Sequence, residues 1–330
     1  AAMPLWAREL TEAALSCGDI AVARRGMQEM IASAIHDTAL MSAGLALSED
    51  RLADAETVLR ARLREYPADV IAIRMMAELA TRLGRMKDAE RLLLRALDLA
   101  PFFAAARELY ARNLQRSNRP GEALDQVARL LENEPDHPSY LMLQASLMVK
   151  TGDQIGARDV YRKVLAKHPE HAKTWMSLGH VLKTLGQRQE GVDAYRRALD
   201  IEPTLGEVWW SLANLKTITF SDDDVVAMEA ALDRLEQRSG SDDDRFHLHF
   251  ALGKAREDRG EYDAAFDHWQ SGNALRRRSL PYNAEATHRE CEAAKAFFDR
   301  ERLAGHTGCL STDPIFILGL PRAGSTLVEQ

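Results

Sequence analysis

The sequence of 330 residues contains only three cysteines, and none of them belongs to a metal-binding or redox motif. Cys17, Cys291 and Cys309 lie far apart, and their number is odd, so a disulfide framework is not expected. We expect reduced thiols in a cytoplasmic protein.

Long apolar runs and an excess of positive charge are also missing. No stretch approaches about 18 consecutive apolar residues, so no transmembrane helix is predicted. The first residues, AAMPLWAREL, lack the basic start and apolar segment of a signal peptide. The net charge is −7, which argues against nucleic-acid binding driven by overall charge. Hydrophobic residues nevertheless make up 46% of the chain, which is ample material for a core.

The strongest signal in the sequence is a repeated spacing. Five of the 11 prolines are evenly spaced along the chain, at Pro67, Pro101, Pro135, Pro169 and Pro203. A small residue lies at the same distance before each of these prolines, at Ala55, Ala89, Ala123, Ala157 and Gly191. We call the two evenly spaced series the ladders. Two ladders with the same period indicate a repeat array.

The residue types in the two ladders suit pairs of helices. Apolar residues recur at helical spacing within a period, as at Trp175, Leu178 and Leu182. The small residue fits where the two helices cross, because a larger side chain would push their axes apart. The proline ends the second helix, because it lacks an N–H group and disfavours helical conformation in the residue before it.

The period and the helix–turn–helix unit resemble the tetratricopeptide repeat (TPR), which is about 34 residues long. Residues 172–205 resemble it most closely. The resemblance implies an all-α superhelical solenoid over residues 1–283. We expect a degenerate capping pair first, because Arg25 and Gln28 break its apolar pattern, and a second degenerate unit after residue 205. The expected units are 2–35, 36–69, 70–103, 104–137, 138–171, 172–205, 206–245 and 246–279.

Two polar patterns allow a metal site as one interpretation. Ser-Asp-Asp-Asp occurs at 221–224 and 241–244, where the carboxylates are either metal ligands or caps of a helix N-terminus. We favour caps. His247, His249 and His268 suggest zinc, but no cysteine or i,i+4 histidine pair accompanies them, so packing or surface histidines are favoured. No metal site is predicted.

The inner face of the array has an unexpected charge. In TPR arrays certain positions of each first helix line the inner surface. Across residues 70–205 only Glu78 and Glu108 are acidic at these positions. The pattern predicts a groove for a peptide or protein segment of acidic character, since cations beside adaptable methionine surface suit carboxylates. The alternative is a solvated face without a ligand. The predicted groove residues are Arg74, Arg82, Arg112, Arg116, Met142, Lys150, Lys173, Met176, His180, Lys183 and Trp210.

The sequence changes character towards its end. Residues 284–313 are expected to form a connecting helix, over 284–303, and a linker. From residue 315 a continuous apolar run, Ile-Phe-Ile-Leu, is typical of a strand buried in a parallel sheet. It leads into a glycine-rich octet, Gly319 to Thr326, whose backbone N–H groups suit an anion at a helix N-terminus. Ser325 replaces the lysine of a nucleoside-triphosphate-binding loop, which disfavours an NTPase.

The octet resembles the 5′-phosphosulfate-binding loop of sulfotransferases that use 3′-phosphoadenosine 5′-phosphosulfate (PAPS). With the array before it, the chain is similar to bacterial TPR–sulfotransferase fusions with a tyrosylprotein-sulfotransferase-like loop. The resemblance implies that an α/β P-loop-like domain begins at residue 314 and uses PAPS without a metal. It implies Arg322 as the catalytic cation. The implied cofactor-binding residues are Gly319, Pro321, Arg322, Ala323, Gly324, Ser325 and Thr326.

Two functions follow as expectations. In the first, the array recognises a substrate and the C-terminal domain transfers a sulfuryl group from PAPS to an acceptor hydroxyl. In the second, the chain is a non-catalytic TPR scaffold for protein–protein interaction. Under the first, we expect the domain to continue beyond Gln330, so that residues 1–330 alone do not catalyse. The resemblance also implies a bacterial source.

Overall fold

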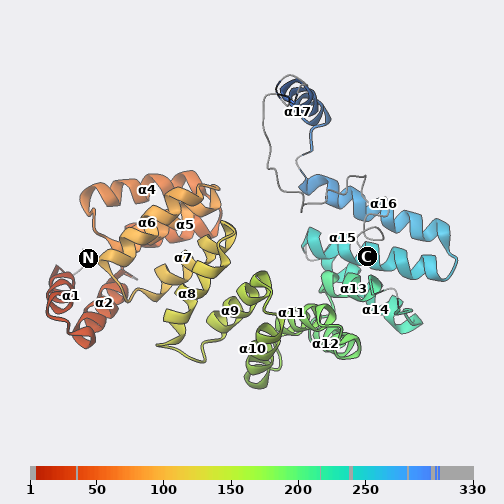
Figure 1. Cartoon of the computed structure of the whole chain (residues 1–330), viewed down its shortest axis with the longest axis horizontal. Helices are drawn as coiled ribbons and strands as arrows, with labels where there is room; N and C mark the ends of the chain where they lie inside the picture. Colours follow the sequence, from red (N-terminus) through yellow and green to blue (C-terminus); the bar gives the residue numbers. More distant parts are fainter. Residues whose placement is uncertain are drawn as a thin grey trace. The chain divides into compact units, whose positions relative to one another are not determined.

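The computed structural model describes residues 5–298 apart from 35, 216, 238–240 and 281, together with residues 302 and 304. The described residues form 17 α-helices and no strand (Figure 1). The predicted strand at 315–320 and the loop from Gly319 to Thr326 lie outside the described residues. The chain divides into two units, residues 1–272 and 273–330, and each is described by itself.

The helices of the first unit follow one another as pairs joined by short turns. The last of them, α16, continues into the second unit. Their bounds are α1 Leu5–Cys17, α2 Ile20–Ala34, α3 Thr38–Ser48, α4 Leu52–Glu65, α5 Val70–Arg82, α6 Met86–Leu99, α7 Ala104–Arg116, α8 Pro120–Leu131, α9 Pro138–Thr151, α10 Gln154–Lys167, α11 Ala172–Thr184, α12 Arg188–Ile201, α13 Gly206–Ala213, α14 Asp222–Gln237, α15 Asp242–Asp258 and α16 Tyr262–Ser279.

The two ladders occupy the positions that the sequence predicts. All five ladder prolines lie in the turn after a second helix. The four ladder alanines are completely buried. At Gly191 an added Cβ would lie 3.4 Å from the carbonyl oxygen of Gly179 in the paired helix. The small residues therefore mark close helix crossings, as predicted.

Each ladder proline also ties its turn to a neighbouring helix through its carbonyl oxygen, which accepts a side-chain hydrogen bond. The donors lie in the first helix that follows or in the second helix of the next repeat. The pairs are Arg95 to Pro67 (2.8 Å), Arg107 to Pro101 (2.6 Å), Lys163 to Pro135 (3.3 Å), Trp175 to Pro169 (2.8 Å) and Trp209 to Pro203 (3.0 Å).

The first helix pair departs from the predicted stack. The backbone of α2 approaches that of α1 closely, but makes no comparable approach to α3 or any other described helix. Instead, α2 lies on the side of α7 and α8 (Figure 1), and buries Met27 and Met30 in the core formed by α5 to α9. The helix pair expected at 2–35 is present as α1 and α2, but α2 packs its apolar residues on a different surface from the one that a regular repeat would use.

The degenerate region after residue 205 departs from regular pairing, because α13 and α14 both pack against α15, which also contacts α16. The backbone N–H of Gly206 donates to Asp244 Oδ1 at 3.0 Å, which joins the start of α13 to α15. Ser221 Oγ accepts from the N–H of Asp224 at 3.2 Å, and Ser241 Oγ accepts from that of Asp244 at 3.4 Å. The Ser-Asp-Asp-Asp segments are thus helix caps, as we favoured.

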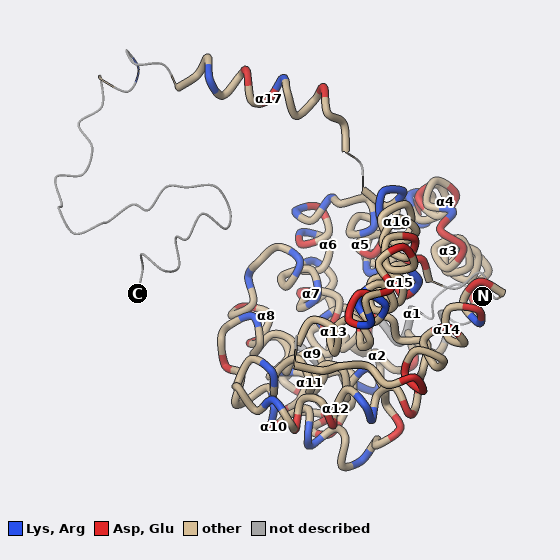
Figure 2. Tube along the Cα trace, turned by 90° about the vertical axis from the view of Figure 1, so that its right-hand side faces the viewer, with Lys and Arg blue, Asp and Glu red and all other residues tan. Residues whose placement is uncertain are grey.

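The second unit contains α17, Ala284–Phe297, within the predicted helix 284–303. It has no buried residue and carries charges of both signs (Figure 2). Cys17 in α1 and Cys291 in α17 are exposed free thiols, and Cys309 lies outside the described residues. No described helix combines the length and apolar character needed to cross a membrane.

Enlarging a ladder residue should destabilise the array. Ala123 on α8 is completely buried, so Ala123→Leu should overpack the crossing and lower the free energy of unfolding by roughly 1–3 kcal/mol. Ala128→Leu, at an exposed position of the same helix, is the matched control and should change stability by less than about 0.5 kcal/mol. Urea unfolding measures both, and equal midpoints would contradict the assigned role.

Two glycines should respond in opposite ways to alanine. At Gly206 a Cβ would lie 2.1 Å from the carbonyl oxygen of Asp244, so backbone must move, and Gly206→Ala should cost roughly 2–3 kcal/mol. At Gly191 the neighbours begin at ordinary contact distance, so Gly191→Ala should be neutral or stabilise by up to about 1 kcal/mol through helix propensity. Thermal unfolding that showed the same shift for both would refute this assignment.

Candidate functional site

The predicted groove residues lie on α13 and on the first helices of four successive pairs, α5, α7, α9 and α11. We call the face that carries them the inner face. Local signals start these helices: the Asp69 carboxylate accepts the N–H groups of Ile71 and Ala72 at 3.1 Å, and α9 begins with Pro138. Four of the predicted cations lie in a last helical turn, where they complement the helix dipole: Arg82, Arg116, Lys150 and Lys183.

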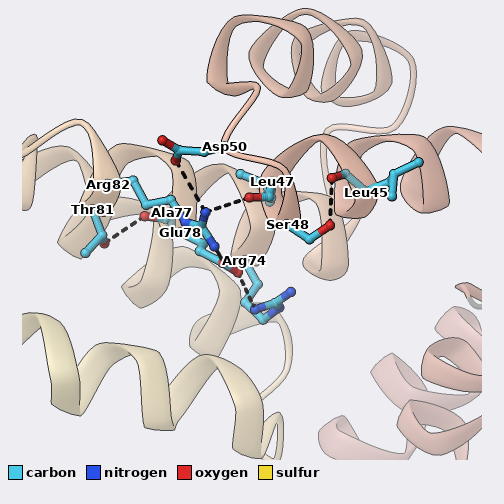
Figure 3. Close-up of polar contacts among 9 residues, drawn as sticks. All are labelled: Leu45, Leu47, Ser48, Asp50, Arg74, Ala77, Glu78, Thr81 and Arg82. Carbon is cyan, nitrogen blue, oxygen red and sulfur yellow. Dashed lines mark hydrogen bonds and ion pairs between the residues drawn. The ribbon is translucent and has the colours of Figure 1, made fainter. Parts of the chain in front are cut away.

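The two cations on α5 are engaged within the array. The Glu78 carboxylate lies between them, 3.2 Å from Arg74 and 2.8 Å from Arg82 (Figure 3). Arg82 also donates to the carbonyl of Leu47 at 2.6 Å and lies 3.7 Å from Asp50 (Figure 3). Arg82 therefore ties α5 to the end of α3, whereas Arg74 pairs within α5.

Two further cations have partners. Arg112 lies 2.8 Å from Glu108, one turn earlier on α7. The Lys150 ammonium donates to the carbonyl of Gln115 at 3.4 Å, across the same separation in sequence as Arg82 to Leu47. Three predicted cations have side chains without a hydrogen bond or ion pair to other described residues: Arg116, Lys173 and Lys183.

A cleft of about 560 Å³ opens between α7, α9 and α11. It brings together three of the predicted groove residues, Arg112, Met142 and Lys173. We call it the inner cleft. Polar side chains complete its lining: Gln115, Ser139, Ser146, His168, Glu170, His171 and Thr174.

Hydrogen bonds hold several of these polar groups in place. Gln115 Nε2 donates to Ser146 Oγ at 2.9 Å, across the space between α7 and α9. The Thr174 hydroxyl lies 2.6 Å from His171 Nδ1 and 3.2 Å from Met142 Sδ, which joins α11 to α9. The inner cleft therefore offers two cations, one carboxylate at Glu170 that lies 3.7 Å from His168, a thioether, and several amide and hydroxyl groups.

The remaining predicted residues lie further along the inner face. His180 on α11 is 3.5 Å from Glu207, and this contact lowers the pKa of the Glu207 carboxyl. The Tyr195 hydroxyl lies 2.8 Å from His180 Nδ1, and burial raises the pKa of Tyr195 to about 12, so it stays protonated. Met176 and Trp210 pack beside the neighbouring core, and the Trp210 ring lies 5.7 Å from that of Phe250.

The histidines that suggested zinc lie in a different place. His249 Nδ1 and His268 Nδ1 are 3.1 Å apart between α15 and α16. Burial lowers the pKa of His249 to about 4 and also lowers that of His268, so both are neutral at physiological pH. Within the described part of the chain, no group of three or more histidine, cysteine or acidic side chains is placed to hold a metal.

The sequence reasoning missed part of the inner cleft, although a signal was present. Ser146 lies one repeat period after Arg112, and Ser139 lies one period before Lys173, so these serines occupy the same repeat positions as the predicted cations. Because serine is uncharged, a prediction based on the positions of cations does not include them. Thr174 and His171 line the inner cleft because α11 approaches α9. No spacing in the sequence predicts that approach.

Comparisons with known proteins agree with the architecture. The family described as tetratricopeptide repeat matches residues 40–104 and 109–162. The chain carries an array of TPR repeats. A second family, the TPR domain of cytochrome c-type biogenesis protein H, matches residues 160–278. Neither match extends into residues 314–330, so the sulfotransferase resemblance rests on the sequence there alone.

Solved structures support the fold of the TPR array. A TPR protein from Parabacteroides merdae matches with a TM-score of 0.53 and 17% identity, over 75% of this chain and 94% of that chain. YrrB, described as a TPR protein with an unusual peptide-binding site, matches with a TM-score of 0.42 and 18% identity, over 49% and 83%. MamA matches with a TM-score of 0.38 and 13% identity, over 62% and 97%. No curated protein matches the sequence.

Proposed function

We propose that the TPR array is a protein–protein interaction scaffold that binds an extended acidic segment of a partner in the inner cleft. The observation that carries this proposal is the gathering of Arg112, Met142 and Lys173 around one space of about 560 Å³. That volume is in the range of roughly 300–1,000 Å³ typical of ligand pockets.

The chemistry of the inner cleft suits carboxylates. The Lys173 ammonium has no ion pair with a described residue, so it can take a ligand carboxylate without losing one. Arg112 pairs with Glu108 where its own side chain is 46% exposed, and such surface pairs contribute only about 0–1 kcal/mol. The guanidinium can therefore exchange Glu108 for a ligand at small cost. Met142 adapts its shape to apolar groups, and the amide and hydroxyl groups suit a peptide backbone.

Charge reversal in the inner cleft should abolish this preference. The double variant Arg112→Glu, Lys173→Glu should weaken binding of an acidic peptide by about tenfold or more, because two attractions become repulsions. Fluorescence anisotropy with acidic and basic peptide libraries measures the effect. Binding to the unaltered chain should also weaken as salt is raised, with a Debye length of about 8 Å at physiological ionic strength.

The matched control is Arg116→Glu, Lys183→Glu, which makes the same change of net charge on α7 and α11 outside the lining of the inner cleft. Acidic-peptide binding should change little in this control. Equal losses in both double variants would show that the attraction comes from overall charge, and would refute the inner cleft as the site.

We infer a second, enzymatic function from residues 314–330. The apolar run followed by the glycine-rich octet supports a PAPS-dependent sulfotransferase, in which the array presents the substrate. In that reaction an S–O bond forms to an acceptor hydroxyl and the S–O bond to the 5′-phosphate breaks. The acceptor proton passes to a basic group, and Arg322 with the loop N–H groups would stabilise the charge on the leaving phosphate.

Kinetics of the intact protein test this second function. Arg322→Ala should lower the rate of sulfuryl transfer more than it weakens binding of the product nucleotide, because the charge that it stabilises develops in the transition state. Arg289→Ala, at an exposed position of α17, is the control and should change neither. Absence of PAPS binding and transfer, or equal effects of the two variants, would exclude the enzymatic function.

A further inference from the structure

The array leaves one apolar surface uncovered where a preceding repeat would stack. Met41 and Leu45 on α3 are 57% and 55% exposed. The residues one repeat period later, Met75 and Leu79, are only 5% and 1% exposed, because they pack in a cluster with α3. A regular repeat that stacked before α3 would therefore bury Met41 and Leu45 in the same way.

The helix pair that would cover this surface lies elsewhere. On α2 the Arg24 guanidinium lies 5.2 Å from the centre of the Phe102 ring and donates to the Asn133 side chain. Met27 and Met30, one and two turns later, are buried in the core of α5 to α9. We call the surface that receives α2 the α2 seat, formed by Phe102, Phe103, Glu108, Asn133, Glu134 and Tyr140.

The α2 seat is incompletely filled by α2. A cleft of about 480 Å³ remains between them, lined on the α2 side by Met27, Gln28 and Ile31. Well-packed interiors leave few voids, and residues beside a void make fewer dispersion contacts. The backbone of α2 approaches closely only that of α1, so α2 is held on the seat by side chains, chiefly those of Arg24, Met27 and Met30.

We propose that the α2 seat is a docking surface for a helix of a partner protein, and that α2 occupies it in the free protein. The ligand is an amphipathic helix with a basic residue followed by apolar residues three and six positions later, the spacing of Arg24, Met27 and Met30. The basic group is recognised by the Phe102 ring, the Asn133 amide and the carboxylates of Glu108 and Glu134. Larger apolar side chains than those of α2 fill the remaining cleft.

When α1–α2 is displaced, it can stack on the exposed apolar surface of α3. Stacking on α3 in the ordinary TPR manner buries Met41 and Leu45, which offsets part of the apolar surface that Met27 and Met30 expose when they leave the seat. Partner binding and stacking of α1–α2 are thus one exchange. The α2 seat prefers a basic helix, whereas the inner cleft prefers an acidic segment, so the two proposals use different surfaces and fail separately.

A labelled peptide of residues 18–36 tests the exchange on the full chain. In the unaltered protein the tethered α2 competes at high effective concentration, so the peptide should bind weakly. Arg24→Glu in the chain weakens the internal contact, and this variant should bind the unaltered peptide roughly tenfold more tightly. Arg25→Glu, an exposed neighbour without these contacts, is the matched control and should behave as the unaltered chain.

A second variant locates the peptide. Phe102→Ala, added to Arg24→Glu, removes the ring that receives the basic group, so it should return peptide binding to the weak level of the unaltered chain. Far-UV circular dichroism verifies that each chain remains helical. Equal peptide binding to the unaltered chain and both single variants, no binding to any of them, or no effect of Phe102→Ala would overturn the proposal.

Discussion

The close crossing of the two helices in each repeat is the constraint on which the array depends. At Gly191 an added Cβ would meet the backbone of the paired helix at 3.4 Å, and the four ladder alanines have no exposed surface. A side chain of one methyl group is thus the largest that the crossing accepts. Because the same crossing recurs in every period of the ladders, the same positions of each first helix face the same side. The inner cleft is a product of that repetition.

Many polar side chains that resemble a binding surface in the sequence serve the stacking of repeats. Every ladder proline carbonyl accepts a side-chain donor, and Arg82 and Lys150 each donate to a carbonyl at the end of the preceding first helix. These bonds join the turns and helix ends of one repeat to the helices of the next. The cations available to a ligand are therefore fewer than the sequence suggests, and Arg112 and Lys173 stand out because they share one cleft.

Periodicity made much of this fold predictable, because each ladder residue has one dominant physical role. The period correctly predicted the turns at the five prolines and three residues that line the inner cleft. The Ser-Asp-Asp-Asp pattern correctly predicted helix caps at Ser221 and Ser241. Arg74, Glu78 and Arg82 are spaced i,i+4, so their pairing was also readable. The position of α2 was not, because Met27 and Met30 fit more than one apolar surface and tertiary packing decides between them.

The two proposed surfaces meet at one ion pair on α7. Arg112 lines the inner cleft, Glu108 belongs to the α2 seat, and they lie 2.8 Å apart. A ligand carboxylate that takes Arg112 leaves Glu108 free to pair with the basic residue of a helix in the seat. A basic helix that takes Glu108 likewise frees Arg112. Since coupling between two binding sites is reciprocal, each ligand should then strengthen binding of the other by the same factor. If both proposals hold, an exposed pair that contributes little to stability would let the binding of one partner influence that of the other.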